Sequence, residues 1–190
     1  ALADGEVKLE AQIDGRIATA SLRIEGSEQP QPFSFQRQIG GILTRRGCNT
    51  SGCHGSVKGK GGFKLSLNSL FPADDYRWIA EGGIYQVLTD KPAGTMEPRI
   101  NLAQPQRSLL LLKPTLTLLH EGGKRFGRDS ADYRTIMNWV RSGAPFVAEK
   151  PGHKIIGLEA YPRAVVLDEA GSQQLLVTAL LANGQREDVT

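Results

Sequence analysis

The side chains with the most distinctive chemistry in this chain lie in one short stretch, residues 48–54. It holds both cysteines of the protein, Cys48 and Cys53, followed at once by His54. Two thiols next to an imidazole are typical of haem c attachment, in which the thiols form thioethers with the vinyl groups and the imidazole binds the iron. The spacer here has four residues, Asn49 to Gly52, instead of the usual two, and all four are small and turn-prone. The pattern predicts one covalent haem c with His54 as the proximal iron ligand.

Two other uses of these residues remain open from the sequence. A disulfide between Cys48 and Cys53 would close a very short loop, so it would add little entropic stabilisation, and it would leave His54 without a role. A structural zinc site needs four ligands, usually arranged as two spaced pairs. The chain offers the cysteine pair, His54 and at most His120 or His153.

The second axial ligand of the iron has four candidates: His120, Met96, Met137 and His153. Met137 falls on the apolar face of an expected helix, which favours core packing. His153 lies in a Pro-Gly linker, which favours a surface position. Met96 lies in a loop rich in proline and glycine, the kind that carries methionine ligands in small cytochromes. His120 lies in a glycine-flanked loop before the last helix and is the ligand we favour; an iron without a sixth protein ligand is the remaining alternative.

The ligand set separates the classes of function. Two imidazoles, or an imidazole and a thioether, close the coordination sphere and favour one-electron transfer. An open sixth position favours a five-coordinate sensor or peroxidase-like site, and a chain without haem favours a structural module. We expect a six-coordinate electron carrier, not an enzyme, with a redox protein as its partner.

Composition limits the classes of partner and the cellular location that this chain could have. The net charge is only +3 and the basic residues are dispersed, which argues against a nucleic-acid partner. The apolar run at residues 109–112 is far too short for a membrane span. The chain opens without a recognisable leader, so we expect a mature product or an excised fragment. Thioether attachment of haem takes place outside the cytoplasm, so we expect a periplasmic or extracellular protein.

Helices in the middle of the chain must position these residues. Residues 33–43 favour a short helix that leads to Cys48, with a weak point or close approach at Gly40-Gly41. Further helices are expected at 72–81, 105–113 and 130–142, the last capped by Asp129 or Ser130. The loop 58–62 is rich in glycine and lysine, and we expect it either to lie along the haem edge, with a lysine near a propionate, or to be a plain solvated loop.

Both ends of the chain alternate apolar and polar residues as β-strands do. Residues 7–13 and 17–24 flank Asp14-Gly15, which predicts a hairpin. Strand chemistry returns in three further segments and a turn, at 155–158, 165–167, 175–181 and Asn183-Gly184. We expect the two β segments to pair with each other or with another copy, because exposed edge strands favour aggregation.

Residues 33–147 resemble a known family. The matching stretches are Gly47 to Gly55, Gly59 to Leu67, Ser108 to Pro114, His120 to Phe126, and Tyr133, Trp139 and Gly143-Ala144-Pro145. They are similar to the atypical c-type cytochrome module of large exported haem proteins of planctomycete-type bacteria, which lies beside bacterial group 2 Ig-like domains. The resemblance implies an electron-carrying haem domain in a larger exported protein. It also implies that the first β segment contains closing strands, and the last one opening strands, of Ig-like domains.

Together these patterns predict an α+β chain in three parts. Residues 1–31 and 151–190 are the β segments, and residues 32–150 are a small, mostly helical, cytochrome c-like haem module.

Overall fold

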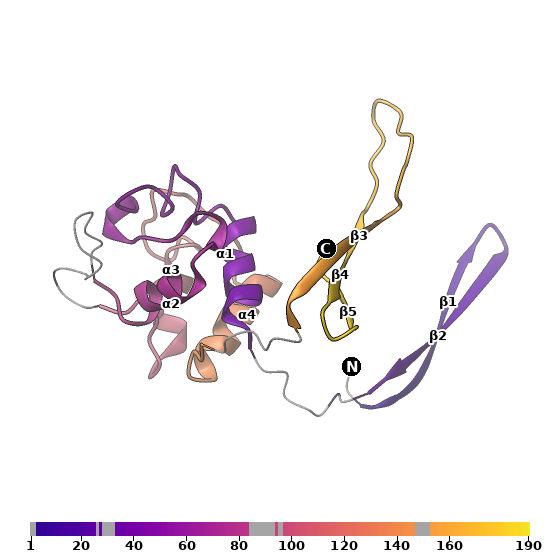
Figure 1. Cartoon of the computed structure of the whole chain (residues 1–190), viewed down its shortest axis with the longest axis horizontal. Coiled ribbons are helices and arrows are strands. Elements are labelled where there is room, and N and C mark those ends of the chain that lie inside the picture. The colour runs from indigo at the N-terminus through magenta and orange to yellow at the C-terminus, as the bar shows by residue number, and fades with distance from the viewer. Residues whose placement is uncertain (1–2, 26, 28–32, 84–93, 95–96, 147–152) are drawn as a thin grey trace. The chain divides into compact units, whose positions relative to one another are not determined.

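The computed structural model describes all residues except 1–2, 26, 28–32, 84–93, 95–96 and 147–152 (Figure 1). It contains both helices and sheets, so the mixed α+β class is confirmed. The chain divides into two compact units, Ala1–Pro32 and Phe33–Thr190.

The first unit contains a two-stranded antiparallel hairpin, β1 (Gly5–Ile13) and β2 (Arg16–Ile24) (Figure 1). The turn between them is Asp14-Gly15, with positive φ angles of 47° and 75° at its two residues. Positive φ at both central residues is what a two-residue hairpin turn requires, so the sequence prediction is confirmed. The register sets Val7 opposite Leu22, which gives the hairpin one apolar face.

The second unit begins with short helical segments. These are the π-helix η1 (Phe35–Gly40), α1 (Gly41–Arg45), η2 (Lys60–Gly62), η3 (Leu67–Ser69), α2 (Pro72–Ala80), η4 (Pro105–Arg107), α3 (Leu109–Leu112) and α4 (Ala131–Arg141). The expected weak point at Gly40 is the junction where η1 passes into α1. A Cβ at Gly40 would lie 3.2 Å from Ser69, so the glycine allows η3 to approach closely.

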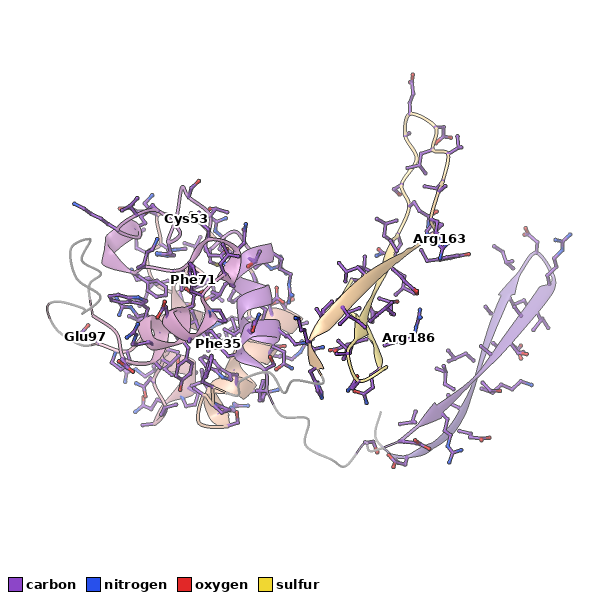
Figure 2. The ribbon with its side chains drawn as sticks, viewed as in Figure 1. Phe35, Cys53, Phe71, Glu97, Arg163 and Arg186 are labelled. Carbon is purple, nitrogen blue, oxygen red and sulfur yellow. The ribbon has the colours of Figure 1, made fainter. Side chains whose placement is uncertain are left out.

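An aromatic cluster centred on Phe35 holds these segments together. The Phe35 ring lies 5.4 Å from Tyr76 of α2 and 5.5 Å from Trp139 of α4, measured between ring centres. Phe35 and Trp139 are completely buried, and the Trp139 indole donates a hydrogen bond to the Pro145 carbonyl at 3.1 Å. Figure 2 shows Phe35 within the helical part of the chain. The core therefore ties the start of the unit to its last helix.

Helix α4 follows its sequence pattern closely. The Ser130 hydroxyl accepts a hydrogen bond from the Tyr133 N–H at 3.1 Å, which makes Ser130 the N-cap. The apolar face is buried, including Ile136, Met137 and Val140. The prediction that Met137 packs in the core is confirmed.

Two predicted elements differ from the structure. The expected helix 105–113 is interrupted at Ser108, whose ψ of 130° is extended and whose hydroxyl accepts the Asn101 N–H at 3.0 Å. The expected strand at 165–167 is absent from the described β pairings, because this segment has no neighbouring strand and Val166 is 99% exposed. Sequence alternation alone was misleading there.

The remaining sheet has three antiparallel strands in the order β3 (Ile155–Tyr161), β4 (Leu176–Leu181) and β5 (Arg186–Asp188) (Figure 1). Ala179 and Leu181 of the central strand are buried. The turn between β4 and β5 contains Asn183 and Gly184, as expected from the sequence.

A buried carboxylate joins the start of α4 to the end of α1. Asp132 is 3% exposed and forms ion pairs with Arg45 and with Arg46, the latter at 2.5 Å between Oδ2 and Nε. Burial acts to raise the pKa of Asp132, but the hydrogen bonds and charges of the two arginines outweigh it and hold the pKa below its usual value. These two ion pairs hold the C-terminal end of α1, which leads to Cys48.

We expect Asp132→Asn to lower the free energy of unfolding by about 1–3 kcal/mol at neutral pH, because two partly exposed guanidinium groups lose their carboxylate. A lowered folded-state pKa stabilises the fold above about pH 4 and loses that stabilisation as the pH falls through the folded value. Urea unfolding from pH 7 to pH 3 should therefore show a smaller acid loss in the variant than in the parent protein.

Asp74→Asn is the matched control, because Asp74 forms only an exposed pair with Arg77 at 2.7 Å. Its effect should stay within about 0.5 kcal/mol. Equal acid dependence in the parent and Asp132→Asn proteins would contradict the role given to Asp132.

Candidate functional site

The motif residues Cys48, Cys53 and His54 line one cavity of about 430 Å³. Small-molecule sites typically enclose about 300–1,000 Å³, so the volume suits a cofactor. Apolar side chains from α1, α3, α4 and the loop before α4 form much of the wall: Ile42, Leu43, Leu109, Leu110, Phe126 and Ile136. Figure 2 shows Cys53 near the upper edge of the helical part. Segments that lie far apart in the sequence, from α1 to α4, therefore enclose the site.

The loop that carries the motif is folded by local hydrogen bonds. The Cys48 carbonyl accepts the His54 N–H at 3.0 Å, and the Thr50 carbonyl accepts the Cys53 N–H at 3.0 Å. A Cβ at Gly55 would lie 2.1 Å from the Asn49 carbonyl oxygen, so only glycine fits there. The four-residue spacer is thus accommodated by a compact turn that keeps both thiols at the same cavity.

Asn49 has a structural role beyond its tendency to form a turn. Its side chain is completely buried, and its amide nitrogen donates hydrogen bonds to the hydroxyls of Thr44 and Ser69, each at 3.0 Å. It therefore ties the motif loop to α1 and η3. No sequence pattern indicated these contacts, because both partners are unremarkable hydroxyl residues.

The structure brings His120 to the same cavity as His54, as the sequence interpretation expected. The two imidazole rings have centres 6.3 Å apart and planes inclined by 12°.

Both imidazoles are oriented by backbone carbonyl groups. Nδ1 of His54 lies 3.0 Å from the Phe63 carbonyl oxygen, and Nδ1 of His120 lies 2.9 Å from the Gly123 carbonyl oxygen. An Nδ1–H that donates to a carbonyl leaves Nε2 with its lone pair, which is the arrangement usual for metal-binding histidines. The His54 carbonyl also accepts the Leu65 N–H at 2.8 Å, so segment 63–65 holds this residue from two directions.

The separation of the rings fits a pair of axial ligands. An imidazole nitrogen binds a transition metal at about 2.0 Å, and the ring centre lies about 1.1 Å further, given ring bonds of about 1.33 Å. Two imidazoles on opposite faces of one metal ion therefore have centres about 6.2 Å apart. The observed 6.3 Å is close to that value, so the spacing of the ring centres leaves room for a metal ion between His54 and His120.

Burial lowers the pKa of His54, and the nearby His120 and Arg99 act in the same direction. Hydrogen bonds that the imidazole donates to the Phe63 and Lys60 carbonyls act to raise it. The lowered pKa favours the neutral imidazole, which is the form that binds metals. The His54 ring is therefore in a form that could bind a metal ion.

The two cysteines are free thiols, and neither forms a disulfide. Burial raises the pKa of Cys48 to about 11, although the Arg125 guanidinium acts to lower it. The Arg125 Nη2 lies 3.6 Å from the Cys53 sulfur, and its Nη1 donates to the Arg46 carbonyl at 3.3 Å. The raised pKa of Cys48 keeps its thiol protonated, which suits a thioether bond better than zinc, since zinc binds thiolates.

A zinc site would also need further ligands. Across the part of the chain that the structure describes, no group of three or more His, Cys, Asp or Glu side chains is placed to hold a metal ion. The zinc alternative therefore lacks ligands there, whereas a haem iron takes four of its bonds from the porphyrin.

The other proposed ligands are not brought to this cavity. Met137 is 7% exposed and packs in the hydrophobic core, and His153 is half-buried just before β3. Neither residue lines the cavity. Met96 lies outside the described residues, so its candidacy stays a prediction.

Charged side chains around the cavity are mostly cationic. Lys60, Arg99, Lys113 and Arg125 line it together with a single carboxylate, Glu121. Lys60, one of the two lysines of the loop 58–62, pairs with Glu121 at 3.2 Å, so its charge is already matched. The sequence did not single out Arg99 or Arg125, because isolated arginines carry no motif.

No helix within the described ranges is long and apolar enough to span a membrane. Comparison of the chain with protein-family models, with curated proteins and with solved structures found no match.

Proposed function

We propose that this protein is a c-type cytochrome that carries single electrons through one six-coordinate haem c. Cys48 and Cys53 would hold the haem as thioethers, and His54 and His120 would bind the iron. The proposal includes the cytochrome c-like character of the helical part, the Ig-like character of the β segments, and an exported location. A redox protein outside this chain is the expected electron partner.

The observation on which the proposal rests is the geometry of the histidine pair. Two imidazoles, each oriented through Nδ1, have centres 6.3 Å apart in a cavity that also contains the two free thiols. A structural histidine needs only a hydrogen-bond partner. It has no reason to share a cavity with a second histidine at the spacing of trans ligands.

The remaining residues suit a carrier whose ligands stay in place. Leu43, Leu110 and Phe126 are buried apolar side chains in the wall, and they keep water away from the axial positions. The bound haem would supply the one-electron chemistry, and the protein would set its potential through the ligands and the surrounding charge. Two imidazoles give a lower potential than imidazole and thioether, because a thioether stabilises ferrous iron.

The proposal is tested with the full chain matured in cells that contain a haem-attachment system. We expect a haem-stained band on a denaturing gel, and a reduced spectrum with sharp bands that carbon monoxide leaves unchanged. The matched control is Cys48→Ala with Cys53→Ala, which should lose the stained band because no thioether can form.

Two results would count against the proposal. If the parent protein gives no stained band, covalent haem c is excluded and the two cysteines must have another role. A stained protein whose spectrum shifts with carbon monoxide would establish an open iron, and sensing or peroxide chemistry would replace electron transfer.

A further inference from the structure

Arg99 is an incompletely neutralised cation at the wall of the cavity. Its side chain is half-buried, and within the described residues it forms no ion pair. Burial lowers the pKa of Arg99, and Glu97 only partly offsets this effect. An arginine in this position keeps its charge, and a partly buried charge is stabilised by a counter-ion.

The structure fixes this guanidinium group in place. It lies 4.9 Å from the centre of the Phe63 ring, and that ring is 4.7 Å from the His54 imidazole. Its Nη2 donates to the Gly83 carbonyl at 2.8 Å, and its Nη1 donates to the carbonyls of Trp78 and Glu97 at 3.4 and 3.2 Å. Among the described residues these contacts use three of its five N–H donors, which leaves two for a ligand.

The other cations at the cavity suit an anion less well. Lys60 is paired with Glu121, and Lys113 is an exposed side chain that donates to the Leu119 carbonyl. Arg125 lies beside the Cys53 sulfur, at the side of the cavity where thioethers would form. The vinyl and propionate groups of haem lie on opposite edges of the porphyrin, so an arginine beside a cysteine is on the wrong side for a propionate.

We propose that Arg99 binds a propionate carboxylate of the haem and thereby fixes the edge of the porphyrin opposite the thioethers. This inference rests on the proposed function. Arginine pairs with carboxylates through parallel N–H donors, and such charge-assisted hydrogen bonds are among the strongest in proteins. The carboxylate would also neutralise the charge next to the proximal imidazole, since the Arg99 charge acts on the pKa of His54.

The test compares two ligands that differ only in their carboxylates. The full chain with Cys48→Ala and Cys53→Ala, in which no thioether can form, is titrated with ferric protoporphyrin IX and with its dimethyl ester. Absorbance gives both dissociation constants. In this background we expect the free acid to bind about tenfold more tightly than the diester, as a partly buried charge-assisted pair implies.

Adding Arg99→Gln should bring the two dissociation constants to within about twofold, with little change for the diester. Binding of the diester is the internal control for folding, because it does not depend on the carboxylate. Arg99→Lys should restore part of the preference, since it restores charge without the fork of donors. The exposed Arg107→Gln should leave the preference unchanged, as should Arg125→Gln.

The inference is overturned if Arg99→Gln keeps the preference for the free acid, or if Arg125→Gln removes it instead. It is also overturned if this cysteine-free chain binds neither porphyrin while the parent protein stains for haem. An unstained parent protein would overturn the proposed function itself, which keeps the two failures distinct.

Discussion

The His120→Ala variant of the haem-loaded protein should bind one carbon monoxide per ferrous haem, whereas the parent protein should bind essentially none. In the proposed cytochrome, removing the His120 imidazole would open one face of the iron and would leave the thioethers and His54 in place. The reduced absorption spectrum, recorded before and after adding carbon monoxide, measures the change. The midpoint potential should also move, because the iron loses a strong nitrogen donor.

His153→Ala is the matched control, since His153 is half-buried and lies away from the cavity. Its spectrum should match that of the parent protein with and without carbon monoxide. If the His120→Ala spectrum remains insensitive to carbon monoxide, another residue closes the iron, and Met96 becomes the first candidate.

The largest loss of stability is expected from Trp139→Ala. Trp139 is completely buried, its ring centre lies 5.5 Å from that of Phe35, and its indole N–H is bonded to the Pro145 carbonyl. Truncation of a buried aromatic ring typically costs about 3–5 kcal/mol, because packing is lost and a cavity remains. Urea unfolding followed by circular dichroism at the helix band measures the effect.

Leu119→Ala provides the comparison, because Leu119 is 87% exposed. Its free energy of unfolding should change by no more than about 0.5 kcal/mol. A Trp139→Ala loss as small as that would mean that α4 does not depend on the aromatic cluster around Phe35.

Sequence patterns were most informative where one local rule dominates. Asp14-Gly15 supplies the two positive φ angles of a tight hairpin turn, and Ser130 provides a capping hydroxyl at the start of α4. The predicted helix 72–81 is α2, at Pro72–Ala80, where a proline at the first turn and glycines after the end set both limits. These features depend on near neighbours alone.

Tertiary contacts decided the rest. Ser108 interrupts the expected helix because its hydroxyl is used by Asn101, and Val166 stays outside the sheet because no strand lies beside it. Of the site, the sequence indicated Cys48, Cys53 and His54 through their spacing, and His120 only by its glycine-flanked loop. Arg99 and Asn49 act through partners that lie near them only in the folded chain, so spacing carried no signal for them.

The residues of the candidate site come from one short loop and from one segment far along the chain, and this affects the order in which the site forms. Both thiols and the first imidazole lie within seven consecutive residues, closed by hydrogen bonds between near neighbours. His120 comes from a separate segment of the chain, far beyond that loop. Short loops close in well under a microsecond, whereas contacts between distant segments wait for the chain to fold. In the proposed cytochrome, a newly exported chain can therefore accept its haem while the later segment is still unfolded. Binding of His120 to the iron would then change the absorption spectrum of the haem, and this change would report that folding is complete.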